Sequence, residues 1–212
     1  MLRLMVLACV LLPLRAEIVD RIAITAGQQV ITELQLDEEL RVAAFLNRQP
    51  VVRDRAARRA AADRLIEQLL IKREMELSHY PLPPPEGVDT YVEQVRAALS
   101  STEDFGEALR RYGLTEAILR EHLEMQLTTL EFIEFRFRPD LGVSPAEIEA
   151  YYQQDLSRRQ AEHPGAKPPT LAEARESIRQ TLAERRTDEA LDAWLKGSRN
   201  QVAIVYLDKS LE

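Results

Sequence analysis

Residues 18–35 read IVDRIAITAGQQVITELQ, and this stretch decides how the chain begins to fold. Isoleucines recur in it at even spacing, a turn around Gly27 follows, and Val-Ile then resumes the extended pattern, as in a β-hairpin. Thr32 and Gln35 next have the spacing of a capping box at a helix N-terminus. The stretch therefore predicts a hairpin over 18–31 that leads directly into a helix ending near residue 47.

A matching strand is predicted at the other end of the chain. Residues 201–207 read QVAIVYL, with apolar side chains on both faces, which predicts a strand that is buried or sandwiched. A hairpin and a lone strand are each unstable in isolation. We therefore expect them to share one small sheet, which brings the two ends of the chain together.

The residues between these two ends favour helix. Only 7 glycines occur among 212 residues, and Ala, Leu, Glu and Arg are abundant. Prolines and capping residues divide the region into segments. The predicted class is mainly α with a small β-sheet, and the expected helices after the first cover about 53–77, 88–99, 101–113, 115–138, 144–160 and 170–197.

The first sixteen residues resemble a secretory signal peptide. Arg3 precedes an apolar run that ends near Ala16, and the run is too short to span a bilayer, which needs about 20 apolar residues. A buried N-terminal helix is the alternative. The signal-peptide interpretation predicts export, with a periplasmic location and no stable membrane insertion after cleavage. The single cysteine, Cys9, would leave with the leader.

Four segments are predicted from these signals. They are a signal peptide over 1–16, a helical module over 17–160, a proline-rich linker over 161–169, and a helix and strand over 170–212 that complete the same core.

The sequence lacks recognisable catalytic chemistry. His79, His122 and His163 have no metal-ligand spacing, and no nucleophile elbow, phosphate loop or dinucleotide fingerprint is present. We therefore expect no catalytic residue, no metal and no cofactor. The formal net charge of −7 argues against nucleic acid as a partner.

A dense group of arginines opens the second predicted helix. It could dock acidic peptides or lipid headgroups, but we favour a solvated helix face whose charges pair with the acidic surplus elsewhere. The group comprises Arg53, Arg55, Arg58, Arg59 and Arg64.

The helix predicted over 115–138 has two apolar stripes rather than one. The first comprises Leu119, Leu123, Leu127, Leu130, Ile133 and Phe137. The second comprises Ile118, Met125, Phe132 and Phe135. The helix is then either clamped between two layers or open to a partner on one side. On the second interpretation, these four residues and Tyr151 would bind apolar segments of a client, because flexible Met and flat aromatic side chains adapt to many sequences.

The order of these elements resembles the SurA family of periplasmic chaperones. The resemblance rests on the opening hairpin and helix (19–34), on the helix-turn-helix around Tyr112-Gly113-Leu114, on the junction Val143-Ser144-Pro145-Ala146-Glu147-Ile148, and on the closing helix and strand with Trp194. It covers nearly the whole chain after the leader. It implies a helical chaperone module of the SurA and trigger-factor type.

One departure from that family changes the expected activity. Relatives carry a parvulin-type isomerase domain between the last two regions, whereas here only about eighteen residues separate Tyr152 from Leu171, too few for such a domain. The resemblance thus implies an ATP-independent holdase for unfolded exported or outer-membrane proteins, and not an enzyme. The alternatives are a peptidyl-prolyl isomerase-related folding factor, and an assembly factor or swapped homodimer with one fixed partner.

Overall fold

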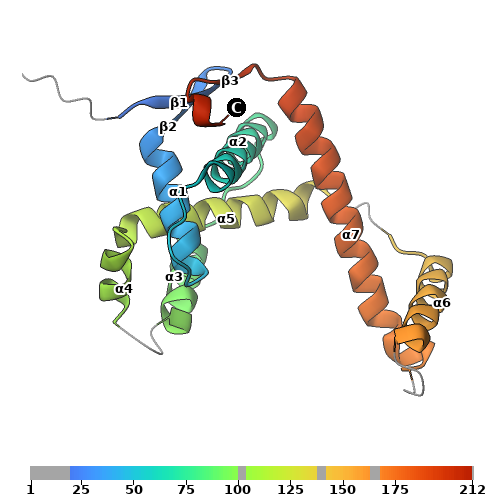
Figure 1. Cartoon of the computed structure of the whole chain (residues 1–212). Coiled ribbons are helices and arrows are strands. Elements are labelled where there is room, and N and C mark those ends of the chain that lie inside the picture. Colours follow the sequence, from blue (N-terminus) through green and yellow to red (C-terminus); the bar gives the residue numbers. More distant parts are fainter. Residues whose placement is uncertain (1–19, 100–103, 138–141, 163–167, 212) are drawn as a thin grey trace, which may run out of the picture.

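The computed structural model describes residues 20–99, 104–137, 142–162 and 168–211, and it is mainly helical with one small antiparallel sheet (Figure 1). The predicted leader, Ser101 and most of the predicted linker lie outside the described residues. The elements are β1 (Ile22–Ala26), β2 (Gln29–Thr32), α1 (Glu33–Leu46), α2 (Arg55–Ser78), α3 (Pro85–Leu99), α4 (Phe105–Arg111), α5 (Glu116–Arg136), α6 (Pro145–Glu162), α7 (Leu171–Asn200), β3 (Ile204–Tyr206) and the 3-10 helix η2 (Lys209–Leu211).

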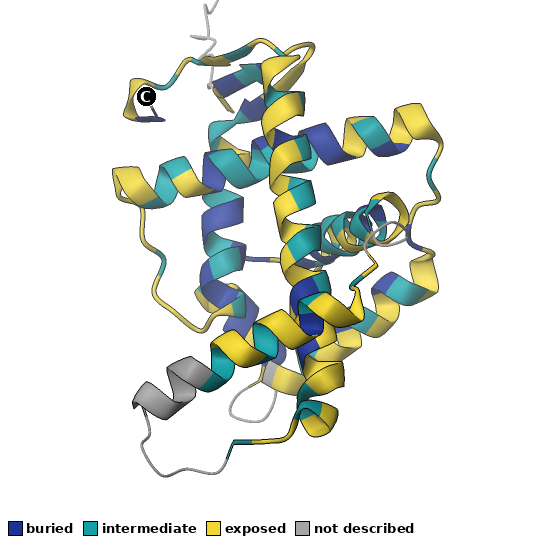
Figure 2. Cartoon of the chain, turned by 90° about the vertical axis from the view of Figure 1, so that its right-hand side faces the viewer, coloured by how far each residue is buried: buried dark blue, intermediate teal, exposed yellow. Residues whose placement is uncertain are grey.

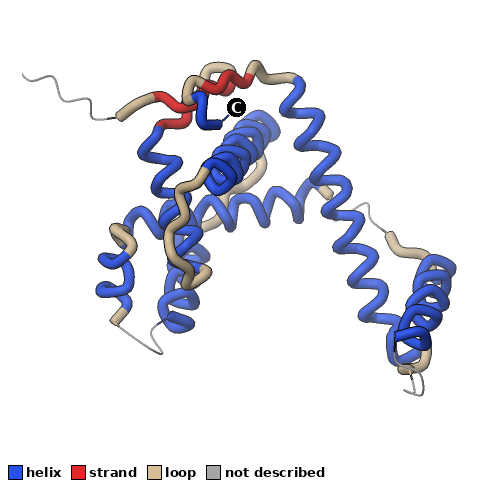
Figure 3. The backbone as a smooth tube through the Cα atoms, in the orientation of Figure 1, coloured by secondary structure: helices blue, strands red, loops and turns tan. Residues whose placement is uncertain are grey.

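The sheet joins the two ends of the described chain, as predicted. Its strand order is β2-β1-β3, and both pairings are antiparallel, with Ile24 opposite Ile31 on one side and Tyr206 on the other. Gly27 turns the hairpin at a φ of 62° and donates its amide to the carbonyl of Ala203 at 2.9 Å. Figure 3 shows the three strands together above the helices.

The prediction that the last strand is buried on both faces is wrong. Because β3 pairs only with β1, it forms an edge of the sheet. Ile204 and Tyr206 pack on the core, whereas Val205 points away and is 49% exposed. Leu207, just after the strand, is also exposed.

The sheet packs on α1 and α2 through a continuous apolar core. Ile24 and Ala23 of β1 meet Leu36 of α1 and the adjacent alanines Ala61 and Ala62 of α2. The small alanine side chains permit a close approach of helix and sheet. The C-terminal Leu211 is fully buried in the same cluster, so the end of the described chain belongs to the core.

Helix starts follow the capping signals in the sequence. Thr32 and Gln35 form a complete capping box at α1, which confirms that prediction, and Thr170 and Glu173 form a second one at the start of α7. Ser144 and Glu147 bond reciprocally at the start of α6. Two helices are longer than predicted. Helix α3 begins at Pro85 instead of near residue 88, and α7 continues to Asn200 instead of ending near residue 197.

Helix α5 crosses the middle of the molecule. Leu119 and Leu123 are fully buried in a second core with Val42 and Phe45 of α1 and Val92 of α3. The apolar stripe that begins with these leucines does not stay buried, since Leu130 is 54% exposed.

Helices α6 and α7 form a hairpin that extends away from the other helices (Figure 1), and Figure 2 shows that much of α7 is exposed. Ile148 of α6 packs on Ile178 and Leu182 of α7, and every described member of this apolar cluster lies between residues 143 and 182. The second half of α7 instead packs on α2 and α5 through Leu191 and Trp194. Thus α6, predicted as part of the 17–160 module, packs with the first half of α7.

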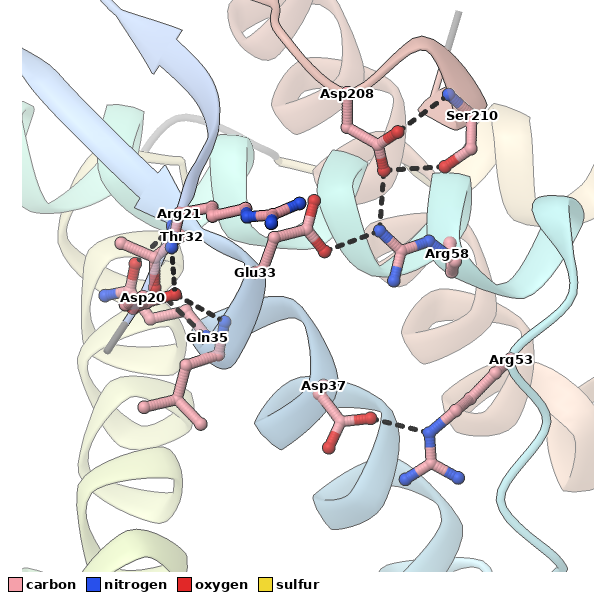
Figure 4. A network of polar contacts seen from close by, with 11 residues as sticks. Asp20, Arg21, Thr32, Glu33, Gln35, Asp37, Arg53, Arg58, Asp208 and Ser210 are labelled. Carbon is pink, nitrogen blue, oxygen red and sulfur yellow. Dashed lines mark hydrogen bonds and ion pairs between the residues drawn. The ribbon is translucent and has the colours of Figure 1, made fainter. Parts of the chain in front are cut away.

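An arginine on α2 connects both ends of the described chain (Figure 4). Arg58 Nη2 lies 2.7 Å from Glu33 Oε2 on α1 and 2.6 Å from Asp208 Oδ2 after β3. Asp208 also accepts hydrogen bonds from the hydroxyl and amide of Ser210, and these bonds, with Arg58, lower the pKa of its carboxyl from 3.8 to about 2. The Asp208 carboxylate is therefore ionised at neutral pH.

The neighbouring arginines of this group also make intramolecular contacts. Arg53 binds Asp37 at 2.6 Å, Arg64 binds Glu39 at 2.6 Å, and Arg59 lies 4.4 Å from the ring centroid of Tyr206. The predicted pairing with acidic residues is confirmed for Arg53 and Arg64, as it is for Arg58. The group thus fastens α2 to α1 and to the C-terminal segment.

Removing Arg58 should loosen the closure of the chain. Arg58→Gln leaves Glu33 and Asp208 without their shared cation, and we expect a loss of about 1–3 kcal/mol in the free energy of unfolding. Urea unfolding followed by the fluorescence of Trp194, the single tryptophan, measures it. Arg73→Gln, at an exposed position on the same helix, is the control. Equal stability of the two variants would contradict a structural role for Arg58.

Candidate functional site

A groove of about 690 Å³ lies between β2, α1, α2 and α5. Leu82, from the connection between α2 and α3, also borders it. The apolar lining residues are Val30, Ile31, Val42, Leu65, Leu69, Leu82, Ile118 and Met125. The polar ones are Gln35, Glu38, Glu39, Gln68, Lys72, Glu121, His122, Glu124 and Thr128.

The apolar lining consists of buried residues beneath the groove and of partly exposed residues at its border. Ile31 and Val42 are buried and belong to the two cores beneath the groove. Met125 and Ile118 are half-buried on α5, and Leu82 is 62% exposed. An apolar ligand entering here would remove further apolar surface from water, which is favourable at about 25 cal/mol per Å².

A buried carboxylate joins the three helices that line the groove. Glu39 of α1 is only 4% exposed. Its Oε1 accepts a hydrogen bond from Arg64 Nε of α2 at 2.6 Å, and its Oε2 lies 3.3 Å from His122 Nδ1 of α5. Burial raises the pKa of Glu39, but the bonds to His122 and Arg64 outweigh it, so the pKa lies below its ordinary value.

The polar network continues from His122 away from Glu39. His122 Nε2 lies 3.2 Å from Gln126 Nε2, and the hydroxyl of Tyr91 on α3 donates to Gln126 Oε1 at 3.1 Å. Each of these buried or half-buried polar groups therefore has a partner, as a stable interior requires. The network links α1, α2 and α5, which line the groove, to α3 through Tyr91.

The arrangement favours binding rather than acid-base chemistry. A general base works best with a pKa near the operating pH. Glu39 has instead a lowered pKa and is held by two cationic or polar partners. Among the described residues there is no group of three or more His, Cys, Asp or Glu side chains placed to hold a metal ion.

The five predicted client-binding residues do not form one surface. Ile118 and Met125 line the groove. Phe135 is 48% exposed and stacks on Tyr80, with ring centroids 6.1 Å apart, at the end of α5. Tyr151 lies in the cluster between α6 and α7.

The prediction that Phe132 lies on an open, client-binding face of α5 is wrong. Phe132 is fully buried, and the ring of Trp194 covers it with a centroid separation of 4.7 Å. The periodicity of α5 alone could not show that Trp194 of α7, which is 62 residues after Phe132, returns to this side. The second stripe of α5 is thus partly open, at Met125, and partly covered, at Phe132.

Residue type and spacing did not identify every residue that lines the groove. Leu65 and Leu69 of α2 also border it, although their apolar spacing is the one expected of a core face. Leu82 lies between Pro81 and Pro83 and is exposed. A large apolar residue in a proline-rich connection is a sequence signal that could have indicated a ligand contact.

No family model matches this sequence, and comparison with curated proteins also gives no match. In the described part of the chain, no helix has the length and apolar character needed to cross a membrane.

The different burial of Phe132 and Phe135 predicts different effects of the same substitution. Phe132→Ser removes a core side chain and should cost about 3–5 kcal/mol in the free energy of unfolding. Phe135→Ser, at a half-exposed site, should cost less than about 1 kcal/mol. Thermal unfolding followed by circular dichroism compares them. Similar melting temperatures would contradict the observed packing of Trp194 on Phe132.

The Glu39 network predicts a defined pH dependence. Because its folded pKa lies below the ordinary value of 4.5, the Glu39 carboxylate stabilises the fold above that pH, and the contribution is lost as pH falls through the folded pKa. Glu39→Gln should therefore be less stable than wild type by about 1–3 kcal/mol at pH 7. The difference should shrink below pH 4.5. Urea unfolding at a series of pH values measures it, and a difference that grows with acidity would contradict this assignment.

Proposed function

We propose that this protein is an ATP-independent holdase of the SurA type that binds apolar segments of unfolded exported polypeptides. The groove bordered by Met125, Ile118 and Leu82 is the observation that carries the proposal. Its volume of about 690 Å³ lies within the range of about 300–1,000 Å³ that is common for ligand pockets.

The character of the lining supports an unspecific apolar ligand. Met125 has an unbranched and polarizable side chain that adjusts to differently shaped partners. Leu82 and Val30 reach solvent at the border, and Leu82 comes from a connection rather than from a helix. Such a surface accepts many apolar sequences at modest affinity, because ordering an unfolded client costs conformational entropy.

The rigid support beneath the lining also favours repeated binding and release. The Glu39 network joins the helices around the groove, and the shared sheet closes the chain behind them. A preformed site loses less entropy on binding than a site that must first assemble. No nucleotide is then needed to open or close it, which suits a compartment that lacks ATP.

On the resemblance to the SurA family, an isomerase domain would be expected between α6 and α7. In this chain α6 continues to Glu162, α7 begins at Leu171, and their apolar faces pack on each other. We therefore propose the chaperone activity of that family without its isomerase activity. Export to the periplasm belongs to the same proposal and rests on the leader-like residues 1–16.

Suppression of aggregation tests the holdase proposal. An outer-membrane β-barrel protein is diluted from urea, and light scattering is followed with increasing amounts of the chaperone. The double variant Leu82→Gln/Met125→Gln should require several-fold more protein for equal suppression, because the groove border loses apolar surface. Circular dichroism verifies that the variant is folded.

Leu130→Gln is the matched control, since Leu130 is exposed on the same helix as Met125 but does not border the groove. It should suppress aggregation as wild type does. Absence of suppression by wild type would overturn the holdase proposal. Full activity of the double variant would overturn the assignment to the groove.

A further inference from the structure

The charges around the groove are strongly unequal. Four carboxylates line it, on Glu38, Glu39, Glu121 and Glu124, and the only ammonium group in the lining is that of Lys72. Glu39 is already paired with Arg64 and His122 at the base. Three carboxylates therefore remain to be balanced at the border of an otherwise apolar site.

These three side chains have little local compensation. Within the described residues, neither Glu121 nor Glu124 has a hydrogen bond or ion pair on its carboxylate. Arg41 attracts Glu38, but its guanidinium bonds to Asp37 at 3.0 Å and also to the carbonyl of Gly113. Arg120, on α5 beside Glu121, pairs with Asp89 instead.

The charges also act on one another. Burial raises the pKa of Glu38, and the neighbouring carboxylates Glu121, Asp20 and Asp37 raise it further against the attraction of Arg41. Glu38 of α1 and Glu121 of α5 both line the groove, and their carboxylates repel each other. A cation bound beside these carboxylates would reduce the repulsion between them, and its attraction to them is the screened attraction of exposed charges, because Glu121 and Glu124 are exposed.

We propose that the groove selects client segments in which apolar residues are flanked by lysine or arginine. The apolar side chains occupy the space beside Met125, Ile118 and Leu82, while the basic residue lies against Glu38, Glu121 and Glu124. This inference rests on the proposed function and names the class of sequence that the same site prefers. Acidic flanks are disfavoured, because they meet like charges at the border.

A pair of labelled peptides tests the preference with the full chain. Both carry the same apolar core, and lysine flanks one core while glutamine flanks the other. Fluorescence anisotropy at low salt should show the lysine peptide binding about three- to tenfold tighter. The preference should decline at high salt, because the ions screen exposed charges.

Substitutions then locate the preference. Glu121→Gln/Glu124→Gln should abolish the difference in affinity between the lysine peptide and the glutamine peptide. Glu76→Gln/Glu107→Gln changes the net charge equally at exposed positions outside the groove, and should keep the preference. A preference that survives in the first variant, or that falls equally in both variants, overturns the proposed location.

The remaining outcomes separate this inference from the holdase proposal. Equal binding of both peptides to wild type, with loss of binding in Leu82→Gln/Met125→Gln, overturns the charge preference and leaves the holdase proposal standing. Binding of neither peptide to wild type overturns the use of this groove for clients altogether.

Discussion

Strand β1 is the constraint on which the rest of the structure depends. It hydrogen-bonds to β2 on one edge and to β3 on the other, so the N-terminal hairpin and the last strand are held together by the same five residues. Neither the hairpin nor the three-residue β3 has enough partners to be stable alone. Packing of Ile24 and Ile31 on α1 and α2 provides the buried surface that stabilises all three strands. The ion pairs of Arg58 then join the same elements at the surface.

This closure determines where α7 runs. Because β3 must reach β1, the helix before it passes along α2 and places Trp194 on Phe132. The first half of α7 has no such attachment and pairs with α6 instead. One side of α5 is covered in this way at Phe132, and the groove lies where that coverage is absent, around Met125. The same long-range contact thus separates the core part of α5 from its accessible part.

The groove combines apolar walls with carboxylates at its border. Apolar walls favour the release of water, whereas uncompensated carboxylates favour hydration and repel each other. The buried Glu39, paired with Arg64 and His122, resolves this at the base, because it fixes α1, α2 and α5 at a set spacing. In the proposed function, such a site binds adaptable apolar segments and discriminates between them by charge at its border. The proposed holdase requires both properties, because it must retain unfolded chains weakly and release them without an energy source.

Local rules predicted much of the fold from particular residues. The capping boxes at Thr32 and Thr170, the turn at Gly27 and the even spacing of Ile22 and Ile24 depend on contacts within a few residues, so the sequence by itself determined where these elements begin and turn. It also indicated that the two termini share a sheet, because an isolated hairpin and strand have no other way to satisfy their backbone groups.

Only the tertiary structure decided which apolar faces stay open. The periodicity of α5 placed Met125 and Phe132 on one stripe, but Trp194 covers Phe132 while Met125 borders the groove. It also decided that Val205 is exposed, since β3 lies at the edge of the sheet, and that Glu39 is buried between Arg64 and His122. The physical reason is the same in each case. Burial depends on which distant segment arrives at a face, and the spacing of residues along one helix or strand carries no information about that segment.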